Sequence, residues 1–311
     1  MRVLFWGTPH FAAPPLRALL GEGFDVAAVV TQPDKPVGRS RSRVEPPPIK
    51  EIALEEGLPV LQPVRPRGDD AFAARLRGIA PDLSIVVAYG HILPRELIDL
   101  PRKGTLNIHA SLLPTLRGAA PVQAAIREGL AETGVTIMRM VPKLDAGPIL
   151  HQLRTPIADD ETGGELALRL SELGALALIE ALAAIELGAI AERAQDDAAA
   201  TYASKIDREA TRIDWRRPAV EVARVIRAYD PKPGALATHR DSDVKLFGAR
   251  AMASLRTLDP GTVTVIDNNG MAVACGDGAV QVTILQPSGK RRLTPAEWAN
   301  GRGIAVGERL S

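Results

Sequence analysis

The first half of the chain alternates short apolar runs with segments of helical periodicity. The apolar runs predict strands at residues 3–6, 26–30, 83–88 and 104–109. The helical segments, with apolar side chains on one face, are residues 11–20, 49–56 and 70–79. This alternation predicts an α/β fold with a doubly wound, mostly parallel sheet and helices on both of its faces.

The pattern changes after residue 161. Thr162 and Glu165 have the spacing of a capping box and precede a long apolar helix that is expected to end near Gly188. Beyond residue 206, short apolar runs alternate with turn sequences, and Asn269-Gly270 between two such runs predicts a hairpin. We therefore expect three parts: a catalytic domain (1–188), a polar linker (189–206) and a small β-barrel (207–311).

Charge is nearly balanced over the whole chain, at +1, which neither favours nor excludes a nucleic-acid partner. Its distribution is uneven, because residues 207–311 contain 16 Lys and Arg against 12 Asp and Glu, whereas the remainder contains 22 against 25. The C-terminal part is therefore the better candidate to bind a polyanion.

The end of the predicted strand 104–109 carries the strongest candidate chemistry. Side chains alternate faces along a strand, so Asn107 and His109 should project to the same side. An amide can donate hydrogen bonds to a developing oxyanion, and an imidazole can transfer a proton near neutral pH. Asp145, in a turn after another apolar run, supplies a carboxylate of the kind that orients a histidine, although aspartate in a turn is by itself ordinary turn chemistry. We expect His109 to face outward and to contribute little to the core.

Other common site types lack support in the sequence. The Gly7-Thr8-Pro9 turn lacks the pattern of a dinucleotide-binding loop, and no nucleotide-triphosphate loop pattern occurs. One cysteine, Cys275, and five scattered histidines give no metal-ligand spacing, so we expect no metal site and a Cys275 that is a small buried hydrophobe. No secretory leader and no membrane-length apolar run is visible, so a cytoplasmic protein is expected.

A family resemblance becomes specific at these residues. The motifs that carry it are Asn107-x-His109-x-Ser111-Leu112-Leu113-Pro114, Arg117-Gly118-Ala119-Ala120-Pro121 and Leu144-Asp145-Ala146-Gly147. Together they resemble the formyltransferases that use 10-formyltetrahydrofolate, and within this family they match best the members that formylate initiator methionyl-tRNA. Further stretches match in the family's order, at residues 5–9, 31–36, 87–90, 132–138, 213–215 and 285–290. The resemblance thus covers essentially the whole chain.

The resemblance implies roles for particular residues. It implies that Asn107, His109 and Asp145 are catalytic and that 10-formyltetrahydrofolate is the formyl donor, with no metal involved. The residues that it implies for folate binding are Ser111, Leu112, Leu113, Pro114, Tyr89, Gly90 and Ile92. The implied architecture is a Rossmann-like formyltransferase domain followed by a barrel similar to an OB-fold. We expect the protein to be a monomer.

Residues 33–50 form a second informative region. They include five prolines, and their basic residues are Lys35, Arg39, Arg41, Arg43 and Lys50. The prolines predict an extended surface loop, and long irregular loops are often functional. In the tRNA-formylating members of the family, a basic loop at this place grips the acceptor end of the initiator tRNA. The resemblance therefore implies that Lys35, Arg39, Arg41 and Arg43 contact tRNA.

Two alternatives remain open at this point. A formyltransferase that acts on a small amine, such as glycinamide ribonucleotide or an amino-sugar nucleotide, shares the Asn-x-His and Asp arrangement. The basic loop and the C-terminal barrel argue against it, because a small acceptor requires neither. A nucleic-acid-binding module without catalysis would use the barrel alone, and the intact set of Asn107, His109 and Asp145 argues against that.

Overall fold

The computed structural model describes residues 1–37, 43–253 and 258–311. The chain forms two compact units, each built from segments that are discontinuous in sequence. Unit 1 comprises Met1–Gly118, Thr133–Thr155 and Ala167–Tyr202, and unit 2 comprises Ala119–Glu132, Pro156–Leu166 and Ala203–Ser311. The domain boundaries at residues 188 and 206 stay a prediction.

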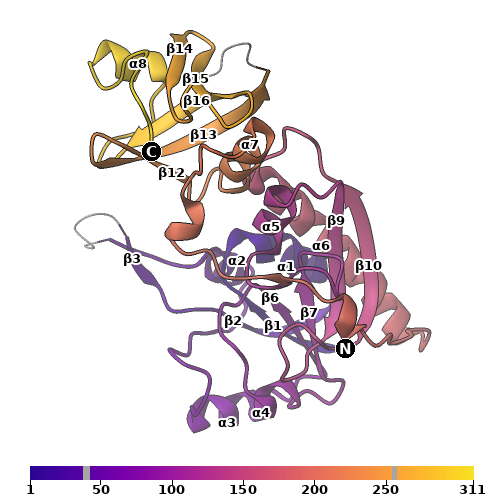
Figure 1. Ribbon diagram of the computed structural model, residues 1–311. Coiled ribbons are helices and arrows are strands. Elements are labelled where there is room, and N and C mark those ends of the chain that lie inside the picture. The colour runs from indigo at the N-terminus through magenta and orange to yellow at the C-terminus, as the bar shows by residue number, and fades with distance from the viewer. Residues whose placement is uncertain (38–42, 254–257) are drawn as a thin grey trace. The chain divides into compact units, whose positions relative to one another are not determined.

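A seven-stranded sheet forms the centre of unit 1, in the order β10-β9-β7-β6-β1-β2-β5 (Figure 1). Its strands are β1 (Arg2–Gly7), β2 (Asp25–Val30), β5 (Val60–Leu61), β6 (Leu83–Val87), β7 (Thr105–His109), β9 (Glu132–Arg139) and β10 (Ile149–Pro156). The first five run parallel, and β9 is antiparallel to β7. The predicted doubly wound, mostly parallel sheet is therefore confirmed.

Helices cover both faces of this sheet. On one face, Trp6 of β1 packs edge-on against Phe72, with ring centroids 5.8 Å apart. Phe72 belongs to α3 (Asp70–Ile79). Trp6 lies in register with Asn107 across the intervening strand, so Ile108 points to the opposite face. There Gly174 of α6 (Gly163–Glu186) approaches closely, because a Cβ on Gly174 would lie 3.0 Å from the Ile108 Cγ2.

The remaining helices are short. They are α1 (Ala13–Gly21), α2 (Pro48–Glu55), α4 (Arg95–Ile98), α5 (Pro121–Arg127), α7 (Ala219–Ala228), α8 (Pro295–Asn300) and the 3-10 turns at His10–Ala12, Asp197–Ala199 and Glu209–Thr211. The predicted capping box before α6 is confirmed, since Thr162 N–H donates to Glu165 (2.9 Å) and Glu165 N–H donates to the Thr162 hydroxyl (3.3 Å). Among the described residues, no helix has the length and apolar character needed to cross a membrane.

The carboxyl ends of three neighbouring parallel strands, β1, β6 and β7, meet at one edge of the sheet. The loops that follow β1, β2 and β6 are tied together at this edge. Thr8 Oγ1 and Gln32 Nε2 each donate to the Tyr89 carbonyl oxygen, both at 3.0 Å. Ligands of open α/β sheets bind at this edge, which is also where Asn107 and His109 lie.

Unit 2 contains a five-stranded antiparallel sheet in the order β12-β13-β16-β15-β14. Its strands are β12 (Ala235–His239), β13 (Ser242–Met252), β14 (Val263–Asp267), β15 (Gly270–Ala274) and β16 (Ala279–Pro287). The predicted hairpin is confirmed, with Asn268 and Asn269 at its turn. Cys275 follows β15 and is buried, as predicted, and burial raises the pKa of its thiol to about 11.

Residues 307–311 join the two edge strands of this sheet. Thr238 of β12 exchanges two backbone hydrogen bonds with Ser311, at 2.6 and 2.9 Å. Val263 of β14 accepts from Gly307 N–H and donates to the Glu308 carbonyl oxygen, both at 2.8 Å. These bonds close the sheet into the barrel-like form that the sequence predicts.

Gly270→Ala should destabilise unit 2. Gly270 has φ +132°, and a Cβ added there would lie 2.4 Å from the Val282 carbonyl oxygen of β16, a backbone atom that cannot yield locally. We expect a decrease on the order of 3 kcal/mol in the free energy of unfolding, measured by chemical denaturation. Gly188→Ala is the control. Its φ is +66° but nothing lies within 4 Å of the added Cβ, so it should cost roughly 1 kcal/mol. Equal decreases for the two variants would contradict this account.

Candidate active site

His109 ends β7 and lies between two oxygen acceptors. Its Nε2 is 2.9 Å from the Leu116 carbonyl oxygen, and its Nδ1 is 3.7 Å from Asp145 Oδ2. Because a carbonyl only accepts, Nε2 must carry a hydrogen, which fixes the tautomer of the neutral ring. The expectation that His109 faces outward is wrong. The side chain is only 6% exposed, because the turn that contains Leu116 folds back over it.

Asp145 lies in a tight turn that precedes β10 in the chain, and its carboxylate faces His109. Its Oδ2 accepts a hydrogen bond from Gly118 N–H at 2.8 Å. Asp145 has φ +47° and Leu116 has φ +59°, a left-handed conformation that is uncommon for residues other than glycine. Both acceptors around His109 thus depend on turns that are unfavourable in isolation and must be held by other contacts.

Asn107 lies two residues before His109 on the same strand. The two residues pair with Met138 and Thr136 of β9, so they project to the same side, as predicted. Asn107 is half-buried, and within the described part of the chain no hydrogen bond engages its side-chain amide. That amide is therefore available to a ligand, whereas both ring nitrogens of His109 already face protein oxygens.

The turn after β7 is built around the buried Thr136 hydroxyl. This hydroxyl donates to the Ser111 carbonyl oxygen (2.7 Å) and accepts from Leu113 N–H (3.1 Å) and Gln152 Nε2 (2.9 Å). Ser111 and Leu113 are buried, while Leu112 and Pro114 are half-buried. Of the four predicted folate-binding residues in this turn, Leu112 and Pro114 are therefore the ones whose side chains reach the surface.

The other three predicted folate-binding residues have different surroundings in the structure. The Tyr89 ring is 1% exposed and packs edge-on against Trp6, with centroids 5.2 Å apart, and burial raises the pKa of its hydroxyl. A ligand could contact Tyr89 only through its backbone. Gly90 and the exposed Ile92 line a hollow of about 290 Å³, together with Arg65, Pro66, Arg67 and His91.

The two ends of the predicted basic loop form short strands, although its prolines predict an irregular loop. Strands β3 (Lys35–Val37) and β4 (Arg43–Glu45) pair antiparallel. Lys35 Nζ donates to Gln32 Oε1 at 2.7 Å, and Arg43 lies 3.3 Å from the Glu45 carboxylate. Arg39 and Arg41 lie outside the described residues.

The base of this loop is held by an ion pair. Lys50 Nζ lies 2.7 Å from Asp34 Oδ2, and Gln62 Nε2 donates to Asp34 Oδ1 at 2.7 Å. These hydrogen bonds, that from Gln62 first and that from Lys50 second, lower the pKa of the Asp34 carboxyl group. Lys50 is therefore part of the frame that anchors the loop.

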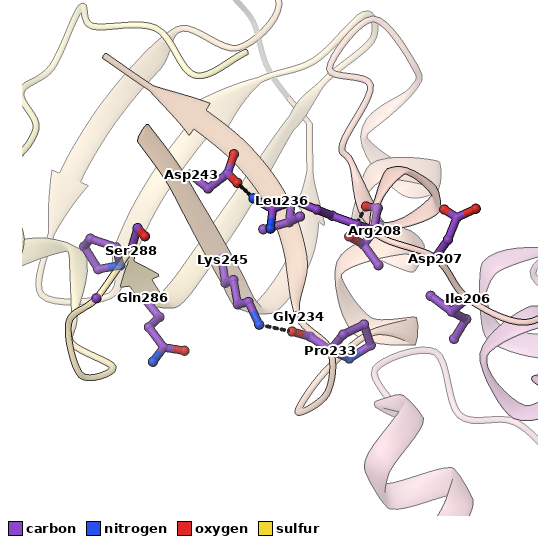
Figure 2. Close-up of a pocket in the computed structure, with 13 residues that line it drawn as sticks. Ile206, Asp207, Arg208, Pro233, Gly234, Leu236, Asp243, Lys245, Gln286 and Ser288 are labelled. Carbon is purple, nitrogen blue, oxygen red and sulfur yellow. Dashed lines mark hydrogen bonds and ion pairs between the residues drawn. The ribbon is translucent and has the colours of Figure 1, made fainter. Parts of the chain in front are cut away.

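Unit 2 contains a cavity of about 460 Å³ beside β12, β13 and the end of β16 (Figure 2). Lys245 Nζ donates to the Pro233 carbonyl oxygen at 2.6 Å on one side of the cavity, and on the other Asp243 forms ion pairs with Arg208 and Arg212. The end of β16 and the turn after it contribute Gln286, Pro287, Ser288 and Gly289. These last residues belong to the family-like stretch 285–290, for which the sequence predicts no particular role.

The site in unit 1 combines groups that suit acyl-type transfer. A carboxylate, an imidazole and an amide converge at the carboxyl end of β7, where they can move a proton and stabilise a developing negative charge. Thr136 and Gln195, which hold the surrounding turns, were not predicted as site residues. Thr136 lies in the family-like stretch 132–138, whereas no sequence motif marks Gln195. The described residues contain no cluster of His, Cys, Asp and Glu arranged to hold a metal ion.

The family models that match this chain show that it is a one-carbon transferase. The profile of the formyl transferase family matches residues 1–182, and that of the formyl transferase C-terminal domain matches residues 205–303. The chain therefore belongs to the formyl transferase family, as its motifs predict.

Within the family, the chain is similar to methionyl-tRNA formyltransferases. It is 46% identical to the methionyl-tRNA formyltransferase of Pseudomonas paraeruginosa over 302 residues, covering 97% of this chain and 96% of that protein. The solved methionyl-tRNA formyltransferase of Clostridium thermocellum has a TM-score of 0.59 at 14% identity, covering 91% of this chain and 98% of that one. HypX from Aquifex aeolicus, solved with tetrahydrofolic acid, has a TM-score of 0.69 at 22% identity over 99% of this chain, which spans 48% of HypX. The two structural similarities concern the fold.

Thr136→Val should destabilise unit 1 through the turn after β7. The variant keeps the shape of the side chain and removes a buried hydroxyl that serves three hydrogen-bonding groups. We expect a decrease of roughly 2–3 kcal/mol in the free energy of unfolding, measured by urea denaturation. Thr105→Val is the matched control on the neighbouring strand, where the buried hydroxyl makes one bond, to the Ile98 carbonyl oxygen at 2.7 Å. A cost for Thr136→Val no larger than that of the control would disprove a central role for this hydroxyl.

Proposed function

We propose that this protein transfers the formyl group of 10-formyltetrahydrofolate to the α-amine of initiator methionyl-tRNA. The product is N-formylmethionyl-tRNA for translation initiation, and the protein works as a cytoplasmic monomer. The observation that carries the proposal is the meeting of His109 and Asp145 at 3.7 Å beside Asn107 in a chain of this family. The name shared by relatives at this level of identity over nearly the full length supports the choice of acceptor.

The chemistry follows from the three side chains. The neutral amine attacks the formyl carbon, and the formyl oxygen becomes an oxyanion. The Asn107 amide donates a hydrogen bond to this oxyanion, an effect on the order of 3 kcal/mol for one donor in comparable sites. His109 exchanges the Leu116 carbonyl for the reacting group and gives its Nε2 proton to the leaving nitrogen of the folate. The proton that the attacking amine loses passes through water and the Asp145 carboxylate to Nδ1, so the ring ends neutral. The Asp145 carboxylate faces Nδ1 at 3.7 Å and keeps the ring oriented.

The formyl donor binds at the strand-end edge of unit 1 in this proposal. Leu112 and Pro114 offer apolar surface for its flat ring system. Gly90 and Ile92 line the hollow described above, which takes another part of the folate. Arg65 and Arg67 line the same hollow as Gly90 and suit the carboxylates at the other end of a folate. Ser111, Leu113 and Tyr89 contribute through the backbone that their buried side chains hold in place.

The tRNA is held by two basic parts of the chain in this proposal. Lys35, Arg39, Arg41 and Arg43 of the loop contact the acceptor end. The second part is residues 207–311, which carry the excess of basic residues. Unit 2 contains the cavity at Lys245 and Ser288, whose polar lining suits the sugar–phosphate backbone. A small amine is too small to contact these surfaces, so their presence favours tRNA as the acceptor over a small amine.

Replacing the three candidate catalytic residues should slow formyl transfer by orders of magnitude. Asn107→Ala, His109→Gln and Asp145→Asn each remove one function, and glutamine at position 109 keeps an N–H donor for Leu116. The triple variant should be only slightly slower than the slowest single variant, because the groups act as a unit. Single-turnover formylation measures this, with thermal unfolding as the control for folding. Near-normal turnover in His109→Gln, or rate reductions that multiply, would contradict the assignment.

The loop arginines should set the salt dependence of tRNA binding. We expect Arg39→Ala/Arg41→Ala to weaken methionyl-tRNA binding and to flatten the log–log salt slope by about two units, because each arginine neutralises one phosphate. Folate affinity should stay within a factor of two. The matched control is Arg75→Ala/Arg77→Ala on the exposed face of α3, which removes the same charge elsewhere. If the loop variant gives the wild-type line, the loop does not contact tRNA, and a small-amine acceptor becomes the better proposal.

A further inference from the structure

The Gln195 side chain bridges two parts of unit 1 that are far apart in sequence. Its Nε2 donates to the carbonyl oxygens of Asp145 (2.8 Å) and Gly147 (2.7 Å). Its Oε1 accepts from Arg117 Nε at 3.0 Å and from Nη2 at 2.8 Å. All the hydrogen-bonding capacity of this one amide is thus used by the turn that carries Asp145 and by Arg117 of the short strand β8 (Arg117–Gly118).

Arg117 fixes which way the amide points. Its side chain is 0% exposed, and its guanidinium bonds to Gln195 Oε1 and to Asp197 Oδ1. A buried guanidinium requires acceptors, so the oxygen of the amide must face it. The amide nitrogen is consequently directed at the two carbonyls of the Asp145 turn. A flipped amide would place its N–H groups against the Arg117 guanidinium and its oxygen against the carbonyl oxygens of Asp145 and Gly147.

The turn held by Gln195 needs such a support. Asp145 has φ +47°, and Gly147 lies so close to β9 that a Cβ there would be 1.8 Å from the Arg139 carbonyl oxygen. The Asp145 carboxylate is held from the other side by Gly118 N–H, next to Arg117 in the chain. Arg117, Gly118, Gln195 and the Asp145 turn therefore form one hydrogen-bonded frame around the carboxylate.

The segment around Gln195 is fastened on both sides. Arg193 exchanges backbone hydrogen bonds with Ile149, at 2.8 and 2.9 Å, and its guanidinium donates to Gln152 Oε1 at 2.7 Å. Thr201 Oγ1 accepts from Leu116 N–H at 2.8 Å, in the turn whose carbonyl faces His109. Residues 193–201, which we name the strap, thus contact both turns that supply the acceptors around His109.

We propose that Gln195 is a positioning residue for formyl transfer, which acts by holding the Asp145 carboxylate in place beside His109. This inference rests on the proposed catalytic role of Asp145. Gln195 itself lies behind the turn and touches backbone atoms, so its contribution is to geometry. A carboxylate displaced by about 1 Å is enough to lower the rate by a factor of about 100.

Gln195→Glu separates this role from a purely structural one. A carboxylate keeps the two acceptor contacts to Arg117, so the buried guanidinium stays paired, but it has no N–H for the carbonyls of Asp145 and Gly147. We expect kcat to fall about 10- to 100-fold while KM for folate and for methionyl-tRNA changes less than about threefold. Gln195→Met, which matches the size of glutamine and adds no charge, should lower kcat in the same way. Thermal unfolding monitors the folding of both variants.

A matched control lies three residues away. Glu192 binds the Arg139 guanidinium, and within the described residues it forms no hydrogen bond or ion pair with the Asp145 turn, so Glu192→Gln should keep kcat within about twofold of wild type. The deciding measurement is the double variant Gln195→Glu/Asp145→Asn, which should be no slower than Asp145→Asn alone, because Gln195 acts through Asp145.

Each outcome has a separate meaning. If Asp145→Asn is as fast as wild type, the proposed catalytic role of Asp145 fails and the role of Gln195 fails with it. If Asp145→Asn is slow but Gln195→Glu has wild-type kcat, only the positioning role is overturned. If the two rate reductions multiply in the double variant, Gln195 acts by a route other than Asp145 and the inference is again overturned.

Discussion

The buried position of His109 between two oxygen acceptors is the constraint on which the rest of unit 1 depends. Those acceptors, the Leu116 carbonyl and the Asp145 carboxylate, both lie on turns with positive φ at residues other than glycine. Such turns persist only where surrounding contacts over-determine them. The sheet places His109 at its edge, but side-chain hydrogen bonds from the Thr136 and strap regions determine what the ring meets there.

Periodicity was sufficient to predict the parallel sheet, the faces of its helices and the hairpin at Asn269-Gly270, because each of these is indicated by a hydrophobic pattern or turn sequence that is local in the chain. It was insufficient for the exposure of His109. A strand-end residue is buried or exposed according to the loop that follows it, and this loop is held by Thr201, which lies 85 residues after its partner Leu116. Local pattern contains no information about such a contact.

The candidate site shows the same division. The Asn107-x-His109 spacing was readable because a strand alternates its faces, and a family resemblance was needed to bring in Asp145. Gln195 could not be predicted, because its role is defined by two carbonyls and a guanidinium that meet only in the folded chain. The position of Tyr89 in a family motif did not indicate that its ring is buried in the core beside Trp6. Roles of Arg39 and Arg41 stay predictions.

The strap has a consequence for exchanging parts between members of this family. A catalytic fragment cut at the end of α6 would lack Arg193, Gln195 and Thr201, and would leave the Arg117 guanidinium buried without its two acceptors. A crossover for a chimaera is therefore better placed after Tyr202, where unit 1 ends, than in the polar stretch after residue 188. If the crossover falls earlier, the strap comes from the second parent protein, and its residues must then match Arg117 and the Asp145 turn of the first. The strap and the active-site turns would then be inherited as one unit of recombination.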